Sequence, residues 1–207
     1  MSTYNTVKKY AREETIIKKS KFITSVTQAS TEEDAWKFVN KIKEEFSDAT
    51  HNVFAFRIGR KGEITKQSDD GEPGGTAGKP VLEVIKNEHL KDTVIVVTRY
   101  FGGIYLGAGG LVRAYSNAAL LGIKKAGIVK KQLYKKLKIK IDYSSWGKLQ
   151  NELKNISGVV EDAIYEDMIT LTVLISPDQL DYLKDLINNL TGGTGDIEEL
   201  DELYMVP

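Results

Sequence analysis

The sequence of 207 residues contains no cysteine and only two histidines, His51 and His89. The absence of cysteine excludes disulfides, thiolate metal sites and a cysteine nucleophile, and it fits a reducing compartment. Two histidines form a metal site only with help from carboxylates, and no metal-ligand spacing is present. The chain also lacks a membrane-length apolar run and the early apolar run of a secretory signal. We therefore expect a cytoplasmic protein with no membrane partner, metal or cofactor.

The formal net charge is zero, because 29 basic residues balance 29 acidic ones, yet the charges are unevenly divided. Residues 1–133 hold 22 Lys and Arg against 15 Asp and Glu, whereas residues 134–207 hold 7 against 14. This asymmetry indicates a basic first half that suits an anionic partner. The alternative is that two separate modules simply differ in surface charge, since an excess of seven is modest for a nucleic-acid-binding protein.

The hydrophobic pattern of the first half predicts a mixture of strands and helices. The segment 62–78 is the least regular part, because its crowded Gly, Asp and Pro residues supply turns rather than a core. Strands are expected at 15–17 and 21–26 (a hairpin), at 52–58 and, buried on both faces, at 93–98; helices are expected from Ser30 to about residue 46, from Pro80, and over about 111–125.

In the second half, the spacing of the apolar residues is more regular and separates strands from helices more clearly. A strand over 134–143 leads to a helix capped by Ser144 and Ser145, then a hairpin around Glu166-Asp167, a helix from Pro177 and a last strand near 196–204. The order β-α-β-β-α-β is the split βαβ or ferredoxin-like pattern. These six elements form a complete domain by themselves. The sequence therefore predicts an α+β protein of two domains, 1–130 and 134–207.

Two glycine-rich stretches resemble nucleotide-binding motifs without matching them. Residues 73–80 look like a phosphate-binding loop, but Pro73 replaces the first glycine and Pro80 replaces the hydroxyl residue that would hold magnesium. In residues 107–112, Val112 stands where a dinucleotide-binding turn has its third glycine, and no clear acidic partner follows. The sequence therefore favours neither a nucleotide triphosphatase nor a dinucleotide-binding domain.

The second stretch still has the makings of an anion site, because a buried strand ends at Arg99 and a glycine-rich loop leads into a helix. Glycines allow close backbone approach, helix N-termini attract anions, and guanidinium groups suit phosphate or carboxylate. The alternative is that Arg99 and Arg113 pair with Asp69, Asp70 or Glu72 and merely pin the loops together. The candidate binding residues are Lys79, Arg99, Tyr100, Gly102, Gly103, Gly107, Gly109, Gly110 and Arg113.

Residues with catalytic potential are few. His51 is the better of the two histidines because Asp48 is close in sequence and the segment enters a strand, yet a structural role for it is favoured over that of general base. Asp70 is the other candidate base. The motif-loop residues taken together are Asp48, His51, Asn52, Asp69, Asp70 and Glu72.

Several blocks, in a fixed order over residues of roughly 20–120, resemble the YigZ/IMPACT family. One departure is Gly74, where the family often has serine, which puts a hydroxyl role at that position in doubt. The blocks are Ser20–Ile23, Asp48–Asn52, Ser68–Pro73, Gly75–Pro80, Val97–Gly103 and Leu106–Tyr115.

The resemblance implies an N-terminal domain like domain 2 of ribosomal protein S5, a fold shared with domain IV of elongation factor G. It also implies a ferredoxin-like C-terminal domain similar to the last domain of that factor. Eukaryotic members regulate translation by competing for a protein partner, and they carry an extra domain for which this chain has no room. The bacterial arrangement therefore fits better, and the eukaryotic partner does not transfer with it.

Two principal hypotheses follow. The first is a non-enzymatic, translation-linked binding protein for RNA, the ribosome or a translation factor, in which Tyr100, Phe101 and Tyr105 stack on bases. Tyr100 and Phe101 are equally suited to serve as core anchors. The second is an enzyme for a small anionic substrate, with His51 or Asp70 as base and Lys79 and Arg99 as anion binders. A deep polar pocket would favour the enzyme, a flat basic face would favour binding, and an exposed apolar patch would favour a protein–protein regulator.

Overall fold

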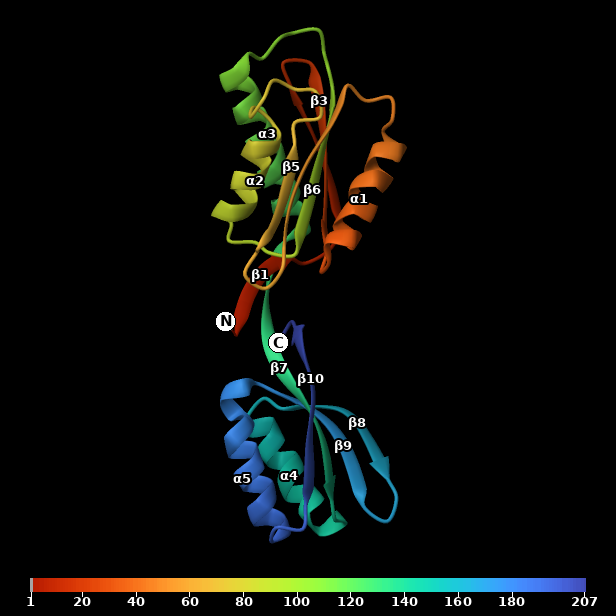
Figure 1. The fold of residues 1–207 in the computed structure, drawn as a ribbon, viewed down its shortest axis with the longest axis vertical. Coiled ribbons are helices and arrows are strands. Elements are labelled where there is room, and N and C mark those ends of the chain that lie inside the picture. Colours follow the sequence, from red (N-terminus) through yellow and green to blue (C-terminus); the bar gives the residue numbers. More distant parts are fainter. Residues whose placement is uncertain (1) are drawn as a thin grey trace. The chain divides into compact units, whose positions relative to one another are not determined.

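The computed structural model describes residues 2–207, which form two compact units. The first unit comprises residues 3–130, and the second comprises residue 2 with residues 131–207. Each unit contains one sheet with helices packed against it, so the protein is α+β, as the sequence predicts (Figure 1). Within residues 2–207, no helix combines the length and the apolarity that crossing a bilayer requires.

The first unit is built on an antiparallel sheet with the strand order β2-β3-β6-β4-β5. The predicted hairpin is β2 and β3, and the predicted apolar strand, β6, lies at the centre of the sheet. In register, His51 at the start of β4 pairs with Arg99 near the end of β6. The strands are β2 (Ala11–Ile17), β3 (Ser20–Gln28), β4 (His51–Ile58), β5 (Ile64–Ser68) and β6 (Thr93–Tyr100).

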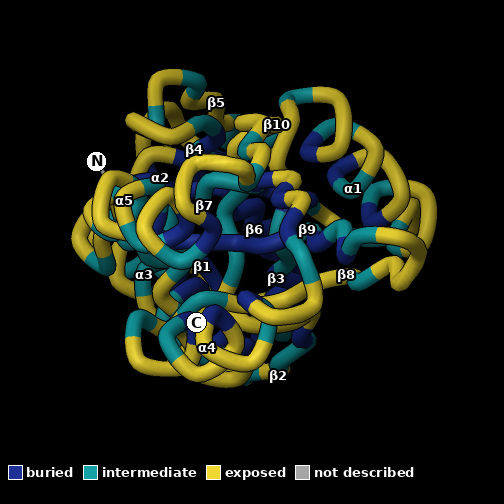
Figure 2. Tube along the Cα trace, turned by 90° about the horizontal axis from the view of Figure 1, so that it is seen from below, coloured by how far each residue is buried: buried dark blue, intermediate teal, exposed yellow. Residues whose placement is uncertain are grey.

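Helices cover both faces of this sheet. Helix α1 (Glu32–Glu45) packs on one face, and α2 (Gly78–Asn87) and α3 (Ala108–Ala126) pack on the other (Figure 1). Alternate residues of β6 face the two sides, with Val94 and Val96 toward α1 and their neighbours toward α3. This explains the continuous apolar sequence of β6, which is among the dark blue, buried segments of Figure 2.

The second unit has the predicted ferredoxin-like order of elements. Its sheet runs β10-β7-β9-β8, all antiparallel, and α4 and α5 cover one face (Figure 1). Leucine and isoleucine side chains from sheet and helices form its core. The elements are β7 (Ile128–Ile141), α4 (Tyr143–Asn155), β8 (Val159–Tyr165), β9 (Ile169–Ile175), a 3-10 turn (Pro177–Gln179), α5 (Leu180–Thr191) and β10 (Asp196–Met205).

Several local features differ from the sequence-based expectations. Strand β5 forms within the segment expected to be irregular, and β1 (Thr3–Val7), beside the first residues of β7, was not predicted. Helix α4 is capped by Asp142, whose carboxylate accepts the N–H of Ser145 at 2.8 Å, so the predicted serine cap is wrong. An aspartate outcompetes serine here because it lies at the N-cap position, three residues before that N–H.

Candidate functional site

The site lies where β6 ends and its following loop, residues 101–107, leads into α3. This loop packs closely on the turn between β2 and β3, because a Cβ atom at Gly102 would lie 2.0 Å from the carbonyl oxygen of Lys19. The N–H of Gly102 also donates to Oγ of the buried Ser20 at 3.2 Å. Only glycine permits this approach, so the loop and the turn form one surface.

A buried carboxylate, that of Glu72, organises the interior beneath the loop. Its Oε1 accepts hydrogen bonds from Arg99 Nη1 at 2.6 Å and from the Tyr115 hydroxyl at 2.7 Å. Nε2 of His51 lies 3.8 Å from the same oxygen. Burial, together with the bond to Glu72, raises the pKa of Tyr115 well above its ordinary value, so this phenol remains a hydrogen-bond donor.

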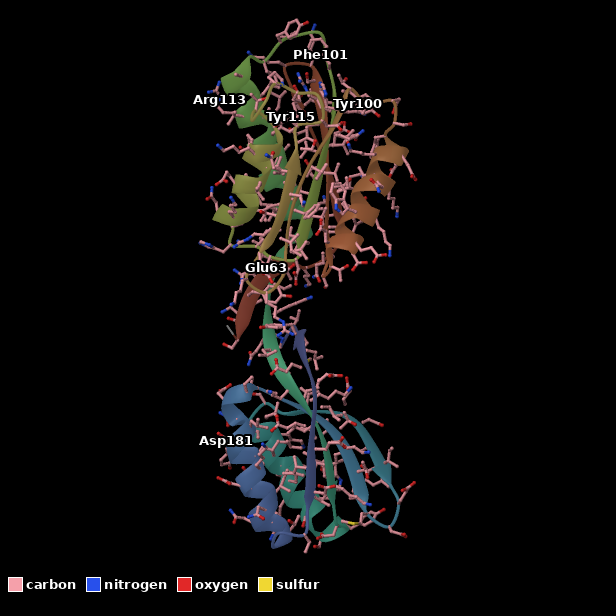
Figure 3. All side chains as sticks on the ribbon, viewed as in Figure 1. Glu63, Tyr100, Phe101, Arg113, Tyr115 and Asp181 are labelled. Carbon is pink, nitrogen blue, oxygen red and sulfur yellow. The ribbon has the colours of Figure 1, made fainter. Side chains whose placement is uncertain are left out.

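The position of Arg99 corrects the expectation that its guanidinium faces outward. Arg99 is only 4% exposed, and it pairs with Glu72 on one side and with Ser20 Oγ, at 3.2 Å, on the other. The internal pairing that was the alternative interpretation therefore applies to Arg99. It does not apply to Arg113, which is exposed on α3 and has no ion pair within residues 2–207. Figure 3 shows Arg113 pointing away from the unit and Tyr115 lying inside it.

The first glycine-rich turn is occupied by a carboxylate of the chain itself. Asp69 accepts the backbone N–H groups of Gly75 (2.8 Å), Ala77 (3.0 Å) and Gly78 (2.8 Å). Burial raises the pKa of Asp69, but these three hydrogen bonds outweigh it, and the net pKa lies below the ordinary value. These amides are therefore not free for an external anion.

Asp70 is engaged in structure and is not a free base, contrary to the catalytic alternative. Its Oδ1 pairs with Lys43 Nζ at 2.6 Å, and its Oδ2 accepts the backbone N–H of Asn52 at 2.6 Å. Asn52 in turn accepts the Thr98 hydroxyl at 2.7 Å. Both residues fix the start of β4, because each joins it to a neighbouring segment.

His51 is held in one orientation by the same loop. Its Nδ1 lies 2.8 Å from the backbone oxygen of Asp70. A carbonyl only accepts hydrogen bonds, so Nδ1 carries the proton, and in the neutral ring Nε2 has a free lone pair. His51 is therefore both a structural residue and the one predicted base whose basic atom remains available.

A pocket of about 340 Å³ opens above this cluster, and residues from both glycine-rich segments line it. The predicted residues that it brings together are His51, Glu72, Arg99 and Gly107. Lys79 is exposed on α2 and does not line it. The complete lining is Thr50, His51, Gly71, Glu72, Pro73, Arg99, Phe101, Tyr105, Leu106, Gly107, Ala108 and Leu111.

Exposed aromatic rings stand at the edge of the pocket. Phe101 is 39% exposed and Tyr105 is 87% exposed, with their ring centroids 5.2 Å apart. Tyr100 points elsewhere, because its hydroxyl donates to Asp48 at 2.8 Å and Lys21 Nζ lies over its ring at 5.1 Å. The hydrogen bond to Asp48 raises the pKa of Tyr100, which therefore stays protonated.

Basic residues flank the aromatic edge. Lys18 and Lys19 are exposed in the β2–β3 turn that contacts the loop. A second depression of about 290 Å³, lined by Lys18, Arg113 and Gly110 among others, shares Leu106 with the main pocket. Gly103 and Gly107, at φ of +82° and +69°, shape the loop, and Gly109 is exposed at the start of α3.

Sequence reasoning assigned no role to Tyr115 or Ser20, although both hydrogen-bond to the cluster. Each is a polar residue at a position that folding buries completely. Both stand inside blocks that carry the family resemblance, and this is the signal that could have identified them.

Comparisons with known proteins agree on both units. The Impact N-terminal domain family matches residues 18–123, and a domain of unknown function, DUF1949, matches residues 139–194. The IMPACT family member YvyE of Bacillus subtilis is 40% identical over 99% of this chain and 94% of its own length. YigZ of Escherichia coli is 32% identical over 77% of this chain and 79% of its own. A crystal structure described as a hypothetical protein, 27% identical, superposes with a TM-score of 0.66 and covers 97% of this chain and 98% of its own.

Proposed function

This chain belongs to the IMPACT family, and we propose that it is a translation-linked binding protein whose first unit contacts RNA. The aromatic edge supports this proposal most directly. Phe101 and Tyr105 expose adjacent rings on a loop held in place by the β2–β3 turn. Stacking on exposed aromatics is how proteins commonly hold the bases of single-stranded RNA.

The basic residues beside the rings supply the second component of such a surface. Lys18, Lys19 and Arg113 are exposed, and none of the three has an ion pair within residues 2–207. Unpaired basic groups next to stacking rings allow the phosphates and the bases of one strand to be bound together. We therefore define the RNA surface as Lys18, Lys19, Phe101, Tyr105 and Arg113.

The enzymatic alternative has less support from the geometry. Arg99 is neutralised by Glu72 at 2.6 Å, so the floor of the pocket offers a small anion no net positive charge. Lys79, the other expected anion binder, lies outside the pocket, and Asp70 is fully engaged. His51 alone retains an available base, and the hydroxyl of its neighbour Thr50 in the pocket lining already accepts the backbone N–H of Phe101 at 3.0 Å.

The test is RNA binding measured by gel shift across a range of salt concentrations. A Lys18→Asn/Lys19→Gly/Arg113→Gln variant should bind single-stranded RNA more weakly, with the slope of log K against log salt reduced by about two for three lost phosphate contacts. Tyr105→Ala should weaken binding by roughly 5- to 100-fold through lost stacking. Tyr105 is almost fully exposed, so its removal should leave stability unchanged.

The matched control removes the same charge elsewhere on the first unit, in a Lys41→Gln/Lys61→Gln/Lys124→Gln variant. All three lysines are exposed and lie outside the RNA surface. If this variant loses as much affinity as the first, or if RNA does not bind at low salt, the proposal is wrong. Retention of a translation factor from nuclease-treated lysate through Tyr105 would instead assign the surface to a protein partner.

A further inference from the structure

The pocket beside the RNA surface has walls and a floor of different chemistry. Its walls are apolar or aromatic, with Phe101, Tyr105, Leu106 and Leu111 among them. Its floor is polar and carries His51, Glu72 and Arg99. A volume of about 340 Å³ falls in the range of small-molecule sites. Walls of this kind suit a flat ring, and a floor of this kind suits a ring with hydrogen-bonding groups along one edge.

The floor has unused hydrogen-bonding capacity although Glu72 and Arg99 are buried. A guanidinium has five N–H donors, and Arg99 uses one on Glu72 and one on Ser20. Its Nε has no hydrogen-bond partner within residues 2–207, which is costly for a side chain only 4% exposed. Oε2 of Glu72 accepts no hydrogen bond from residues 2–207, and Nε2 of His51 keeps its lone pair.

The charge of the floor argues against an anion as its ligand. Glu72 and Arg99 cancel each other across 2.6 Å. An anion would therefore gain no attraction that offsets its loss of hydration in this buried position. A neutral heterocycle loses much less hydration, and it gains contact with the walls.

The kinds of free group on the floor select among the bases. Glu72 lies close to both of the others, because its Oε1 is 2.6 Å from Arg99 Nη1 and 3.8 Å from His51 Nε2. The floor thus offers N–H donors from Arg99 and acceptors from Glu72 and His51. The Watson–Crick edge of guanine presents the complement, because its O6 accepts while its N1–H and 2-amino groups donate. Adenine has one donor group beside an acceptor and leaves part of this pattern unmatched.

We propose that the pocket receives an unstacked guanine base of the bound RNA. The inference rests on the proposed function and deepens it by adding a base-specific position to the surface of stacking rings and phosphate contacts. Phe101 and Tyr105 lie at the mouth of the pocket and also form part of the RNA surface, so a base that leaves the stack enters beside them. Recognition of an extruded base through its Watson–Crick edge is a general mode of RNA binding.

The experiment uses the free nucleoside, so that it does not depend on phosphate contacts. Guanosine is titrated into the full chain while the imidazole resonances are followed by NMR. With only two histidines in the sequence, His89 serves as an internal reference. Guanosine should shift the His51 signals in a saturable manner and leave those of His89 unchanged. Adenosine should shift His51 at least tenfold more weakly at equal concentration, and ribose 5-phosphate should have no effect.

A pocket-filling variant locates the site. Ala108→Leu adds bulk to a wall residue that is exposed at the start of α3, so the fold should survive. It should abolish the guanosine response, whereas Val112→Leu, on the same helix outside the lining, should retain it. In RNA binding, Ala108→Leu should remove any preference for G-containing strands over abasic ones and leave the salt dependence intact.

The two proposals fail in different ways. Salt-dependent RNA binding with no guanosine response would overturn the guanine pocket and leave the RNA surface standing. A response to ribose 5-phosphate equal to that of guanosine would identify an anion site and overturn the base assignment. An equal response to adenosine would overturn the claim that the pocket floor recognises the Watson–Crick edge of guanine in preference to that of adenine. A guanosine response in a chain that binds no RNA would overturn both, because the ligand would then be the free nucleoside.

Discussion

Removal of Arg99 tests the ion pair around which the site is built. Arg99→Met leaves the Glu72 carboxylate, 8% exposed, with the Tyr115 hydroxyl as its one remaining close donor. A buried charge that loses its partner costs about 3–5 kcal/mol, so the free energy of unfolding of the first unit should fall by that amount. Replacing both partners, in Arg99→Met/Glu72→Met, should cost much less, because no uncompensated charge remains.

Each unit carries one tryptophan, which makes the assay specific. Trp36 of α1 packs on Phe54 and Phe56 of the first sheet, with ring centroids 5.1 and 5.5 Å apart, whereas Trp146 lies in α4. In a Trp146→Phe background, urea unfolding followed by fluorescence therefore reports on the first unit alone. The coupling energy follows from the double-mutant cycle with both single variants.

Two results would contradict this role of the ion pair: a cost of less than about 1 kcal/mol for Arg99→Met, or a double variant that costs as much as the two single variants together. Either result would mean that Glu72 does not depend on Arg99, and that water or Tyr115 satisfies the carboxylate. The Tyr115→Phe variant is the matched comparison, because it removes one hydrogen bond to the same oxygen without leaving a charge unpaired. It should cost roughly 1.5–3 kcal/mol, the range for a hydrogen bond to a charged group.

Three further predictions concern the loops that frame the site. Lys18 and Lys19 both have positive φ, 45° and 65°, so Lys18→Asn/Lys19→Gly should raise the free energy of unfolding measured in urea by about 1 kcal/mol, and a fall would contradict the turn geometry. Gly102→Ala should destabilise the first unit by roughly 1–3 kcal/mol through its clash with Lys19, and a neutral result in the same assay would exclude that contact. Asp69→Asn should cost roughly 1–3 kcal/mol at pH 7. Because the pKa of Asp69 is lowered by folding, this difference should shrink as the pH falls below about 4, and a difference that grows in acid would contradict it.

Much of the architecture could be predicted from periodicity. The ferredoxin-like order of the second unit follows from strands and helices of regular length separated by clear turns. Strand β6 was predictable because a strand buried on both faces must be apolar throughout. Strand β5 was not, because an exposed edge strand such as Ile64–Ser68 needs few apolar residues, and its polar sequence reads as loop.

The site was harder to predict, because residue type does not reveal which way a charged group faces. Arg99 and Arg113 are both arginines beside the same glycine-rich loop, yet one is buried against Glu72 and the other is exposed. What separates them is position: Arg99 pairs with His51 in the middle of a sheet, and Arg113 lies on the outer face of α3. That distinction requires the register of β4 with β6, which joins residues 48 positions apart and leaves no local trace in the sequence.

Few charged groups near the site remain available to a partner. The backbone amides of the first glycine-rich turn bind Asp69, Asp70 holds Lys43, and Arg99 holds Glu72, so most of the charged chemistry in these blocks is used to fix the loops. A loop that is fixed by its own buried charges loses little further conformational entropy when it binds a partner. The rigid frame therefore explains how an exposed pair of rings can act as a prearranged stacking surface. It follows that weakening the frame, as in Arg99→Met, should reduce RNA affinity without removing any residue of the RNA surface.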